Sequence, residues 1–198
     1  MNIAILGWGS LLWDLRPEFD GFEKQHDAWQ YNGPCLRLEF SRISQSRKDA
    51  LTLVVESEPN GAPCTVAYAM SKRQELEDAI CDLRCREGTT VANIGVYRST
   101  DPVKSPDHQP EAISAIQSWA IEKKFEAVVW TNLVSNFEEK SKTKKSFSVA
   151  EAVIHLQSLT PEGKSKAAEY IWRAPAFIQA PLRTALQTDP WFIAQPKV

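Results

Sequence analysis

The sequence predicts an α+β protein with a largely antiparallel, closed sheet and helices packed outside it. Strand-like runs dominate the first half of the chain, and helical patterns concentrate in the second half. The two kinds of segment do not alternate regularly, as a doubly wound parallel sheet would require. The chain has 198 residues, 43% of them apolar, which suits one globular domain with a sizeable core. We therefore expect a single domain over residues 1–198.

Six runs are rich in β-branched or aromatic residues, and Gly, Pro, Asn, Asp or Ser bound most of them. The predicted strands cover residues 2–6, 35–40, 51–56, 64–70, 91–98 and 126–134. The segment Glu58-Pro59-Asn60-Gly61 is a turn signal between the third and fourth strands.

Helix starts are marked by local capping patterns. Ser71–Gln74 and Ser148–Glu151 both have the capping-box spacing, in which a serine is followed three residues later by Gln or Glu. The first box predicts a helix that ends near Leu83, with its apolar residues spaced at helical intervals. Thr160-Pro161 predicts an N-cap followed by proline at the first helical position, and this helix should end before Pro175. Further helices are expected over 110–124 and 182–186.

Composition excludes several classes of function. The net charge is −2, and a nucleic-acid-binding protein usually has a basic face. No apolar run approaches the roughly 18–20 residues that cross a bilayer. The N-terminus lacks the basic region of a signal peptide, so we expect a cytoplasmic protein without membrane or nucleic-acid partners. The charge-rich stretch 138–145 is expected to be a solvated loop.

The cysteines and histidines do not form a recognisable metal site. A cytosolic location predicts that Cys35, Cys64, Cys81 and Cys85 are reduced thiols. Cys81 and Cys85 are four residues apart and can share a helix face, but no second close pair or nearby histidine supplies the other ligands of a zinc site. The three histidines, at 26, 108 and 155, are scattered and are expected to be structural or exposed.

The glycine-containing segment Gly7–Asp14 follows the first strand directly. Position 12 is leucine, so the third glycine of a dinucleotide fingerprint is missing. Ser10 directly follows Gly9, which does not fit the G-x-S-x-G nucleophile elbow, and no Gly-Lys-Ser/Thr ending indicates a P-loop. Two interpretations stay open: a loop whose N–H groups hold a substrate, or a tight turn that packs Trp8 and Trp13.

Glu87 is the candidate acid/base. It lies beside Gly88 between a predicted helix and the next strand. A carboxylate at such an edge can face a cavity, where partial burial would raise its pKa toward that of a useful base. The alternative is a surface glutamate paired with Arg84 or Arg86.

Arg42 is a candidate substrate-binding residue. It belongs to the polar segment Ser41–Arg47 that follows the second predicted strand. Arginine suits bidentate recognition of a carboxylate, although it is also common in ordinary loops.

Taken in this order, these pieces resemble the γ-glutamylcyclotransferase-like family, especially its glutathione-acting ChaC-like branch. Leu6–Trp13 resembles that family's Tyr-Gly-Ser-Leu loop, and Leu83–Glu87 resembles the end of its Leu-x-x-Arg-Glu helix. The polar segment 41–47 with the strand at 51–55, and the late Ala168–Ile171 helix, also fall where the branch has similar elements.

The resemblance implies a small, mostly antiparallel β-barrel flanked by helices, and an enzyme that needs no cofactor or metal. It implies that the N–H groups of Trp8, Gly9, Ser10 and Leu11 hold a γ-glutamyl group. It also implies that Glu87 is the general acid/base that drives release of 5-oxoproline from a γ-glutamyl amine or peptide.

Two departures from the family pattern concern the substrate. Trp8 replaces the loop tyrosine, and the Asp-His-Arg-Gly run of glutathione-degrading members is absent. Another γ-glutamyl amine is therefore an open possibility.

The alternative function is a non-catalytic barrel that binds a small metabolite or a protein partner. A weaker third possibility uses the lysines of 140–145 to contact nucleic acid.

Overall fold

The computed structural model describes residues 1–15, 20–104 and 109–194. Contacts divide the chain into two compact units, which we describe separately. The first unit comprises Met1–Leu36 and Thr65–Leu133, and the second comprises Arg37–Cys64 and Val134–Val198. The single domain over 1–198 stays a prediction, because compact units of this size occur both within domains and as domains of their own.

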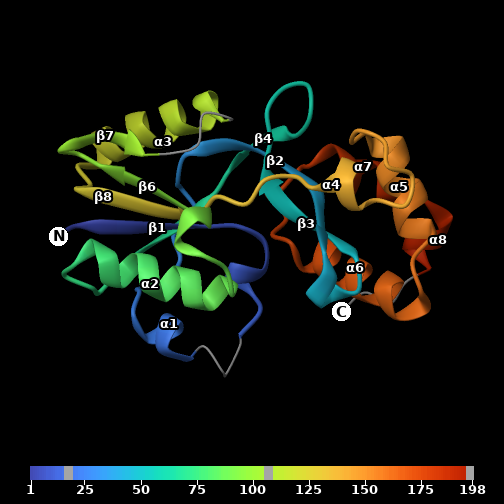
Figure 1. Ribbon diagram of the computed structural model, residues 1–198, viewed down its shortest axis with the longest axis horizontal. Coiled ribbons are helices and arrows are strands. Elements are labelled where there is room, and N and C mark those ends of the chain that lie inside the picture. Colours follow the sequence, from blue (N-terminus) through green and yellow to red (C-terminus); the bar gives the residue numbers. More distant parts are fainter. Residues whose placement is uncertain (16–19, 105–108, 195–198) are drawn as a thin grey trace. The chain divides into compact units, whose positions relative to one another are not determined.

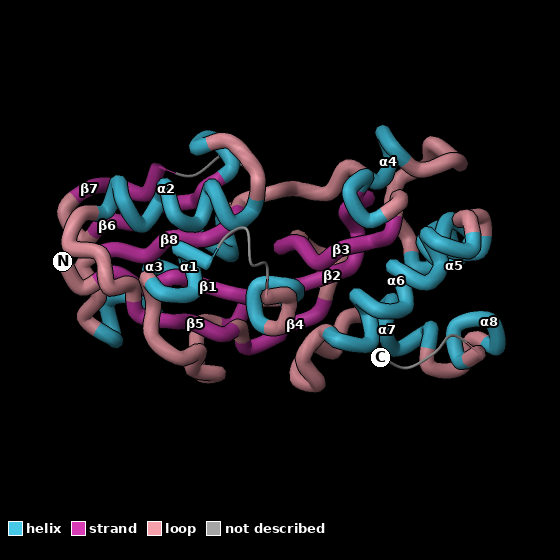
Figure 2. Tube along the Cα trace, turned by 90° about the horizontal axis from the view of Figure 1, so that it is seen from below, coloured by secondary structure: helices cyan, strands magenta, loops and turns pink. Residues whose placement is uncertain are grey.

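The first unit is built on a five-stranded sheet in the order β5-β1-β8-β6-β7 (Figure 2). Its strands are β1 (Ile3–Gly7), β5 (Ala67–Met70), β6 (Ile94–Arg98), β7 (Asp101–Lys104) and β8 (Ala127–Thr131). The pair β1–β8 is parallel, and the other neighbours are antiparallel.

Helices cover both faces of this sheet (Figure 1). They are α1 (Asp20–Lys24), α2 (Leu76–Glu87) and α3 (Pro110–Lys123), with short 3-10 helices at Gly9–Leu12 and Val91–Asn93. Leu76, Ala79 and Leu83 of α2 pack in one cluster with Ile3 and Ile5 of β1. On the opposite face, the Trp119 ring of α3 lies 5.0 Å from the ring of Tyr68 and 5.0 Å from that of Phe125. Because both faces are covered, every residue of β1 is buried.

The second unit combines a three-stranded sheet with helices. Its strands, in the order β3-β2-β4, are β2 (Cys35–Ser44), β3 (Ala50–Val55) and β4 (Ala62–Thr65). Its helices are α4 (Phe137–Lys140), α5 (Val149–Gln157), α6 (Pro161–Arg173), α7 (Pro181–Leu186) and α8 (Pro190–Ile193), with a 3-10 helix at Gln45–Arg47. Helix α6 packs on the sheet, where Tyr170 meets Phe40 edge to face at 6.2 Å.

Strand β2 contains a β-bulge. Glu39 pairs with Val54, but Arg42 pairs with Thr52, so β2 has one more residue than β3 over this stretch. A bulge removes one N–H from the ladder and turns the side chains beside it. Here the N–H of Phe40 donates to the Glu39 side chain at 2.7 Å instead.

The α+β class and the mostly antiparallel pairing are confirmed, whereas the closed barrel is wrong. The described strands form two separate sheets, with β5 and β7 at the edges of one and β3 and β4 at the edges of the other. Closure requires every strand to have two neighbours, and these four have one each among the described residues. The positions of the six predicted strands are otherwise correct to within a few residues, except that 64–70 is divided between β4 and β5 and that 91–93 is a 3-10 helix.

The capping predictions succeeded at two of three places. The Ser148 hydroxyl accepts from the N–H of Glu151 at 3.2 Å, and Thr160 accepts from Gly163 at 3.2 Å. The box at Ser71–Gln74 is wrong, because α2 begins only at Leu76. Ser71 instead forms a β-bridge with His26, and this pairing keeps it in an extended conformation.

Helix α2 also ends later than predicted, at Glu87 rather than near Leu83. Gly88 closes it in the left-handed conformation with φ 61°, which glycine adopts without strain. Glu87 is therefore the last residue of a helix and not part of a connecting loop.

Two polar segments differ from prediction. Ser41–Ser44 lies inside β2 and not after it, because the bulge lets the strand continue through polar residues. The charged stretch 138–145 includes three residues of α4, although its four lysines are exposed as expected.

His108 lies outside the described residues, and His26 and His155 are buried. Within the described ranges, none of the helices combines the length and apolar character that crossing a bilayer demands.

Candidate functional site

The candidate site lies where the parallel strands β1 and β8 end. Their ladder runs from Ile3↔Ala127 to Ile5↔Val129 and stops there. Each strand continues for two residues against its other neighbour: Gly7 pairs with Ala67 of β5, and Thr131 pairs with Ile94 of β6. The carboxyl ends of neighbouring parallel strands are a common place for ligand binding in open sheets.

The glycine-containing loop begins at this edge. Gly9 has a φ of 60° and opens the 3-10 helix Gly9–Leu12. Trp8 is 7% exposed and Leu11 6%, so both side chains belong to the core. The N–H of Leu11 belongs to the hydrogen-bond pattern of the 3-10 helix, and among the described residues no bond outside that helix uses the N–H of Gly9 or Ser10. The loop therefore packs Trp8 into the core, as the tight-turn interpretation expects, and its role in holding a substrate stays a prediction.

A buried arginine connects the loop to α2. Arg86 is 1% exposed, and its Nη2 donates to the carbonyl oxygen of Asp14 at 2.5 Å and to that of Ser10 at 3.4 Å. Its Nε lies 4.0 Å from a carboxylate oxygen of Glu23. The Arg-Glu motif and the loop, more than seventy residues apart, are thus in direct contact.

Glu87 follows Arg86 at the carboxyl end of α2 and is half-buried. The chain's amino group donates to the carbonyl of Gln74 just before α2, so α2 and β1 start at the same edge. The Arg86 contacts put the other end of α2 at the loop. Glu87 therefore lies at the end of α2 that adjoins the candidate substrate loop.

Aromatic side chains pack around the start of the loop. A Cβ on Gly7 would come within 2.6 Å of the Trp29 ring, so only glycine permits this close approach. The His26 ring lies between the rings of Phe22 and Trp29, at centroid distances of 4.7 and 4.9 Å. His26 Nε2 also lies 3.4 Å from Glu23, the carboxylate that faces Arg86. The start of the loop is consequently held in one place.

Arg42 belongs to the second unit. Its Nη1 donates to the carbonyl oxygen of Val134 at 2.6 Å, and burial lowers the pKa of its guanidinium. This contact gives Arg42 a structural role in joining β2 to the segment before α4. Its role in substrate binding stays a prediction.

Two further polar side chains lie at the carboxyl edge of β8 and were not singled out from the sequence. Thr131 is 9% exposed and Asn132 is 6% exposed. Within the described residues, the Thr131 Oγ1 and the Asn132 Nδ2 have no hydrogen-bond partner. The only signal in the sequence is a Thr-Asn pair that interrupts an apolar strand.

The second unit contains a fully buried carboxyl group, Glu39. Its oxygens accept from the N–H of Phe40 at 2.7 Å and from that of Leu182, in the first turn of α7, at 3.1 Å. Burial raises the pKa of Glu39 to about 7 in spite of these two bonds. Burial also raises the pKa of Glu56, whose carboxylate accepts from the Ser41 hydroxyl beside the bulge.

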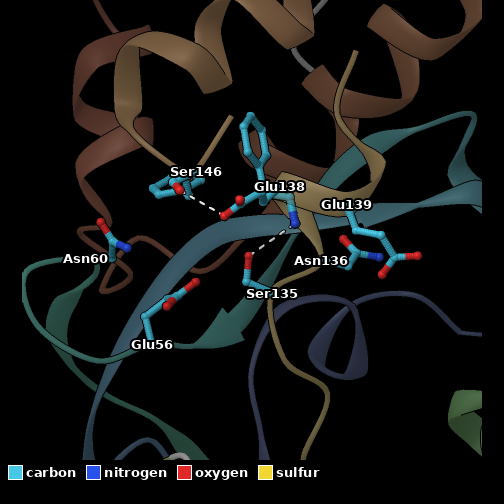
Figure 3. Close-up of a pocket in the computed structure, with 9 residues that line it drawn as sticks. Glu56, Asn60, Ser135, Asn136, Glu138, Glu139 and Ser146 are labelled. Atoms are coloured by element: carbon cyan, nitrogen blue, oxygen red, sulfur yellow. Dashed lines mark hydrogen bonds between the residues drawn. The ribbon is translucent and has the colours of Figure 1, made fainter. Parts of the chain in front are cut away.

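Glu56 lines a cavity of about 390 Å³ in this unit. Figure 3 shows the carboxylates of Glu56 and Glu138 directed into the same space, with Asn60 beside them. Ser146 donates to Glu138 at 2.8 Å, and the rings of Phe137 and Phe147 contribute an apolar wall. This arrangement suits a small molecule that has a cationic group and an aliphatic part.

Cys35, Cys64, Cys81 and Cys85 form no disulfide bond with one another, and Arg84 Nη2 lies 3.1 Å from the Cys85 sulfur. Over the described ranges, no three His, Cys, Asp or Glu side chains are gathered as a metal ion would need. Comparison of the chain with protein families, curated proteins and solved structures found no match.

Proposed function

We propose that the protein is a γ-glutamylcyclotransferase-like enzyme of the cytoplasm that releases 5-oxoproline from a γ-glutamyl amine or peptide. One observation carries the proposal. Arg86 of the Arg-Glu motif donates to Ser10 and Asp14 of the glycine-containing loop, so the two motifs chosen from the sequence meet in one site. Unrelated surface features more than seventy residues apart would have no reason to share a buried contact.

The proposed chemistry is intramolecular and uses one base. Glu87 removes a proton from the substrate's α-amino group, and the nitrogen attacks the γ-carbonyl carbon to close a five-membered ring. The N–H groups of Gly9 and Ser10 donate to the oxyanion of the tetrahedral intermediate. The bond to the leaving amine then breaks as Glu87 returns the proton, and 5-oxoproline departs. Ring closure within one molecule supplies the proximity, so no covalent enzyme intermediate is needed.

The test is 5-oxoproline release from glutathione, γ-glutamyl dipeptides and simple γ-glutamyl amines, by the wild type and by Glu87→Gln. The substitution keeps the shape of the side chain and removes the base. We expect the rate to fall by roughly a hundredfold or more. Glu75→Gln, at the exposed opposite end of α2, is the matched control and should keep full activity.

Two results would refute the proposal. One is that the wild type releases no 5-oxoproline from any donor in the panel. The other is that Glu87→Gln turns over as fast as Glu75→Gln.

A second candidate function, non-catalytic binding of a small metabolite, is favoured by the cavity of the second unit. Its carboxylates and phenylalanine rings match a small organic cation. Titration of the protein with n-butylammonium tests it, with 1-butanol as the neutral comparison. Glu138→Gln should weaken binding of the amine, whereas Glu162→Gln, exposed on α6, should not. Equal binding of amine and alcohol would exclude this function.

A further inference from the structure

The carboxyl edge of β8 has hydrogen-bonding capacity that the protein itself does not use. Among the described residues, the hydroxyl oxygen of Thr131 and the amide nitrogen of Asn132 have no partner, although both side chains are more than nine-tenths buried. The main chain there is paired, since the Asn132 N–H donates to the Asn93 carbonyl at 2.8 Å. Buried polar groups in native proteins are nearly always hydrogen-bonded, so these two point to a missing partner.

Their position is that of the candidate site. The β1–β8 ladder stops two residues before Thr131, at the edge where the loop after Gly7 begins. Strand alternation puts Thr131 on the same face as Val129, which packs in the cluster containing α2. Thr131 therefore shares the face of α2, and Asn132 follows it at the carboxyl edge where the loop with the N–H groups of Gly9 and Ser10 begins and where the Arg86-Glu87 end of α2 lies.

The chemistry of these groups defines what the partner is. An amide N–H₂ and a hydroxyl both donate hydrogen bonds, as do the N–H groups of Gly9 and Ser10. A set of neutral donors suits an anion, and a γ-glutamyl compound carries one such group that takes no part in ring closure, its α-carboxylate. The loop and Glu87 are already assigned to the γ-carbonyl and the α-amine.

We propose that Asn132, with Thr131 beside it, binds the α-carboxylate of the substrate. This inference rests on the proposed function and sharpens its substrate class to donors with an intact α-amino acid head. Three contacts then meet around one α-carbon: Glu87 at the amine, the loop at the γ-carbonyl and Asn132 at the carboxylate. Three fixed points distinguish the two enantiomers, so we expect the enzyme to act on one enantiomer of a γ-glutamyl donor and not on the other.

The experiment compares ligands with and without the carboxylate. 5-Oxoproline and 2-pyrrolidinone differ only in this group, and so do a γ-glutamyl amide and the corresponding 4-aminobutanoyl amide, which still closes a ring. In Asn132→Ala, we expect affinity for 5-oxoproline to fall about tenfold or more, and KM for the γ-glutamyl amide to rise by the same factor. Values for the two ligands without a carboxylate should not change. Thr131→Val, which keeps the shape of the strand residue, should give a smaller change in the same direction.

Asn93→Ala is the matched control. Its amide already donates to Thr89 at 2.8 Å, so it is not available to a ligand. Binding of 5-oxoproline by this variant should equal that of the wild type.

The inference is overturned if Asn132→Ala leaves 5-oxoproline binding unchanged, as it would if water satisfied the amide. It is also overturned if affinity for both ligands falls equally, which marks a structural role, or if the wild type does not bind 5-oxoproline. A different measurement, 5-oxoproline release by the wild type, decides whether the proposed function fails. A protein that binds 5-oxoproline through Asn132 but releases none supports carboxylate recognition without the enzyme.

Discussion

Arg86 in the first unit and Glu39 in the second unit are both almost completely buried, and one side chain is basic while the other is acidic. In the first unit, Arg86 donates to carbonyl oxygens of the loop after β1. In the second unit, Glu39 accepts from the N–H groups of Phe40 and Leu182. Both side chains therefore connect distant parts of the main chain. Each forms hydrogen bonds with main-chain N–H or carbonyl groups outside the regular hydrogen bonds of helices and sheets.

The difference between them lies in what burial does to the charge. A guanidinium is not deprotonated in proteins, and a carbonyl oxygen does not titrate, so the two bonds from Arg86 to the carbonyl oxygens of Ser10 and Asp14 contain no titrating acceptor. A carboxyl group can escape the cost of burial by taking up a proton, and the pKa of Glu39 is raised to about 7. The loop of the candidate site is therefore held by Arg86, whose charge is permanent, whereas the start of α7 is held by Glu39, whose carboxyl group titrates near neutrality.

Removal of Arg86 tests the first half of this comparison and should have the largest effect. Arg86→Met removes the hydrogen bonds to the carbonyl oxygens of Asp14 and Ser10 and the cation near Glu23. We expect the free energy of unfolding to fall by about 4 kcal/mol, measured by chemical denaturation. Arg84→Met, two residues earlier on α2 and not buried, should unfold like the wild type. Equal effects of the two substitutions would mean that the buried contacts contribute nothing.

The pH dependence of stability tests the second half. Because the pKa of Glu39 is raised in the folded state, its contribution is fully present below pH 4.5 and is lost as the pH rises to about 7. The loss over this window should be about 3 kcal/mol. Unfolding measured from pH 4.5 to 7.5 should show it as a difference in slope between the wild type and Glu39→Gln.

His155 also contributes to the pH dependence of stability and is present in both proteins of this comparison. Burial lowers its pKa, so its contribution has the opposite sign and grows as the pH rises. Both proteins retain His155, and the difference between them therefore isolates Glu39. Parallel curves would show that Glu39 does not titrate in this range.

Packing within the first unit can be tested at Gly95. A Cβ on this residue would lie 2.1 Å from the indole of Trp130, the residue paired with it on β8. Gly95→Ala should cost about 2 kcal/mol of stability, because the buried ring has to move. Gly21→Ala is the control, since its added Cβ meets no atom within 4 Å. An unchanged free energy of unfolding in Gly95→Ala would show that the Trp130 ring can move aside at no cost.

The smallest effect concerns two serines that look alike in sequence. Ser148, in the second unit, caps α5, so Ser148→Ala should cost about 1 kcal/mol. Ser71, in the first unit, accepts from Arg73 but starts no helix, so Ser71→Ala should cost clearly less. Thermal unfolding of both variants measures the difference. The reverse order would mean that Ser71 acts as a cap after all.

Much of the fold followed from local patterns. The core strands β1 and β8 and the helices α3, α5 and α6 are located where periodicity, β-branched content and caps indicated, because these signals act between near neighbours in the chain. The same locality explains the errors. A bridge to His26 overrides the box at Ser71, and α2 continues to Glu87, past Arg86, whose side chain contacts the loop.

The candidate site was predictable to the same extent. The loop Gly7–Asp14 and Glu87 were visible in the sequence as residue types with suitable chemistry. Asn132 was not, because an unpartnered amide is defined by what surrounds it and not by its own identity. Glu39 looked like one more residue of an alternating strand, and only the bulge in β2 and the start of α7 reveal its role.

The α+β class, most element positions and the two motifs of the candidate site could be predicted from local stretches of the chain, since these depend on backbone preferences and on chemical type. Tertiary structure decided that the strands form two sheets and not a barrel, that Arg86 joins the motifs, and which polar groups are left without partners. Those features depend on burial and on hydrogen bonds between residues far apart in the chain. Their free energies are properties of pairs of residues, and no single stretch of sequence contains both members.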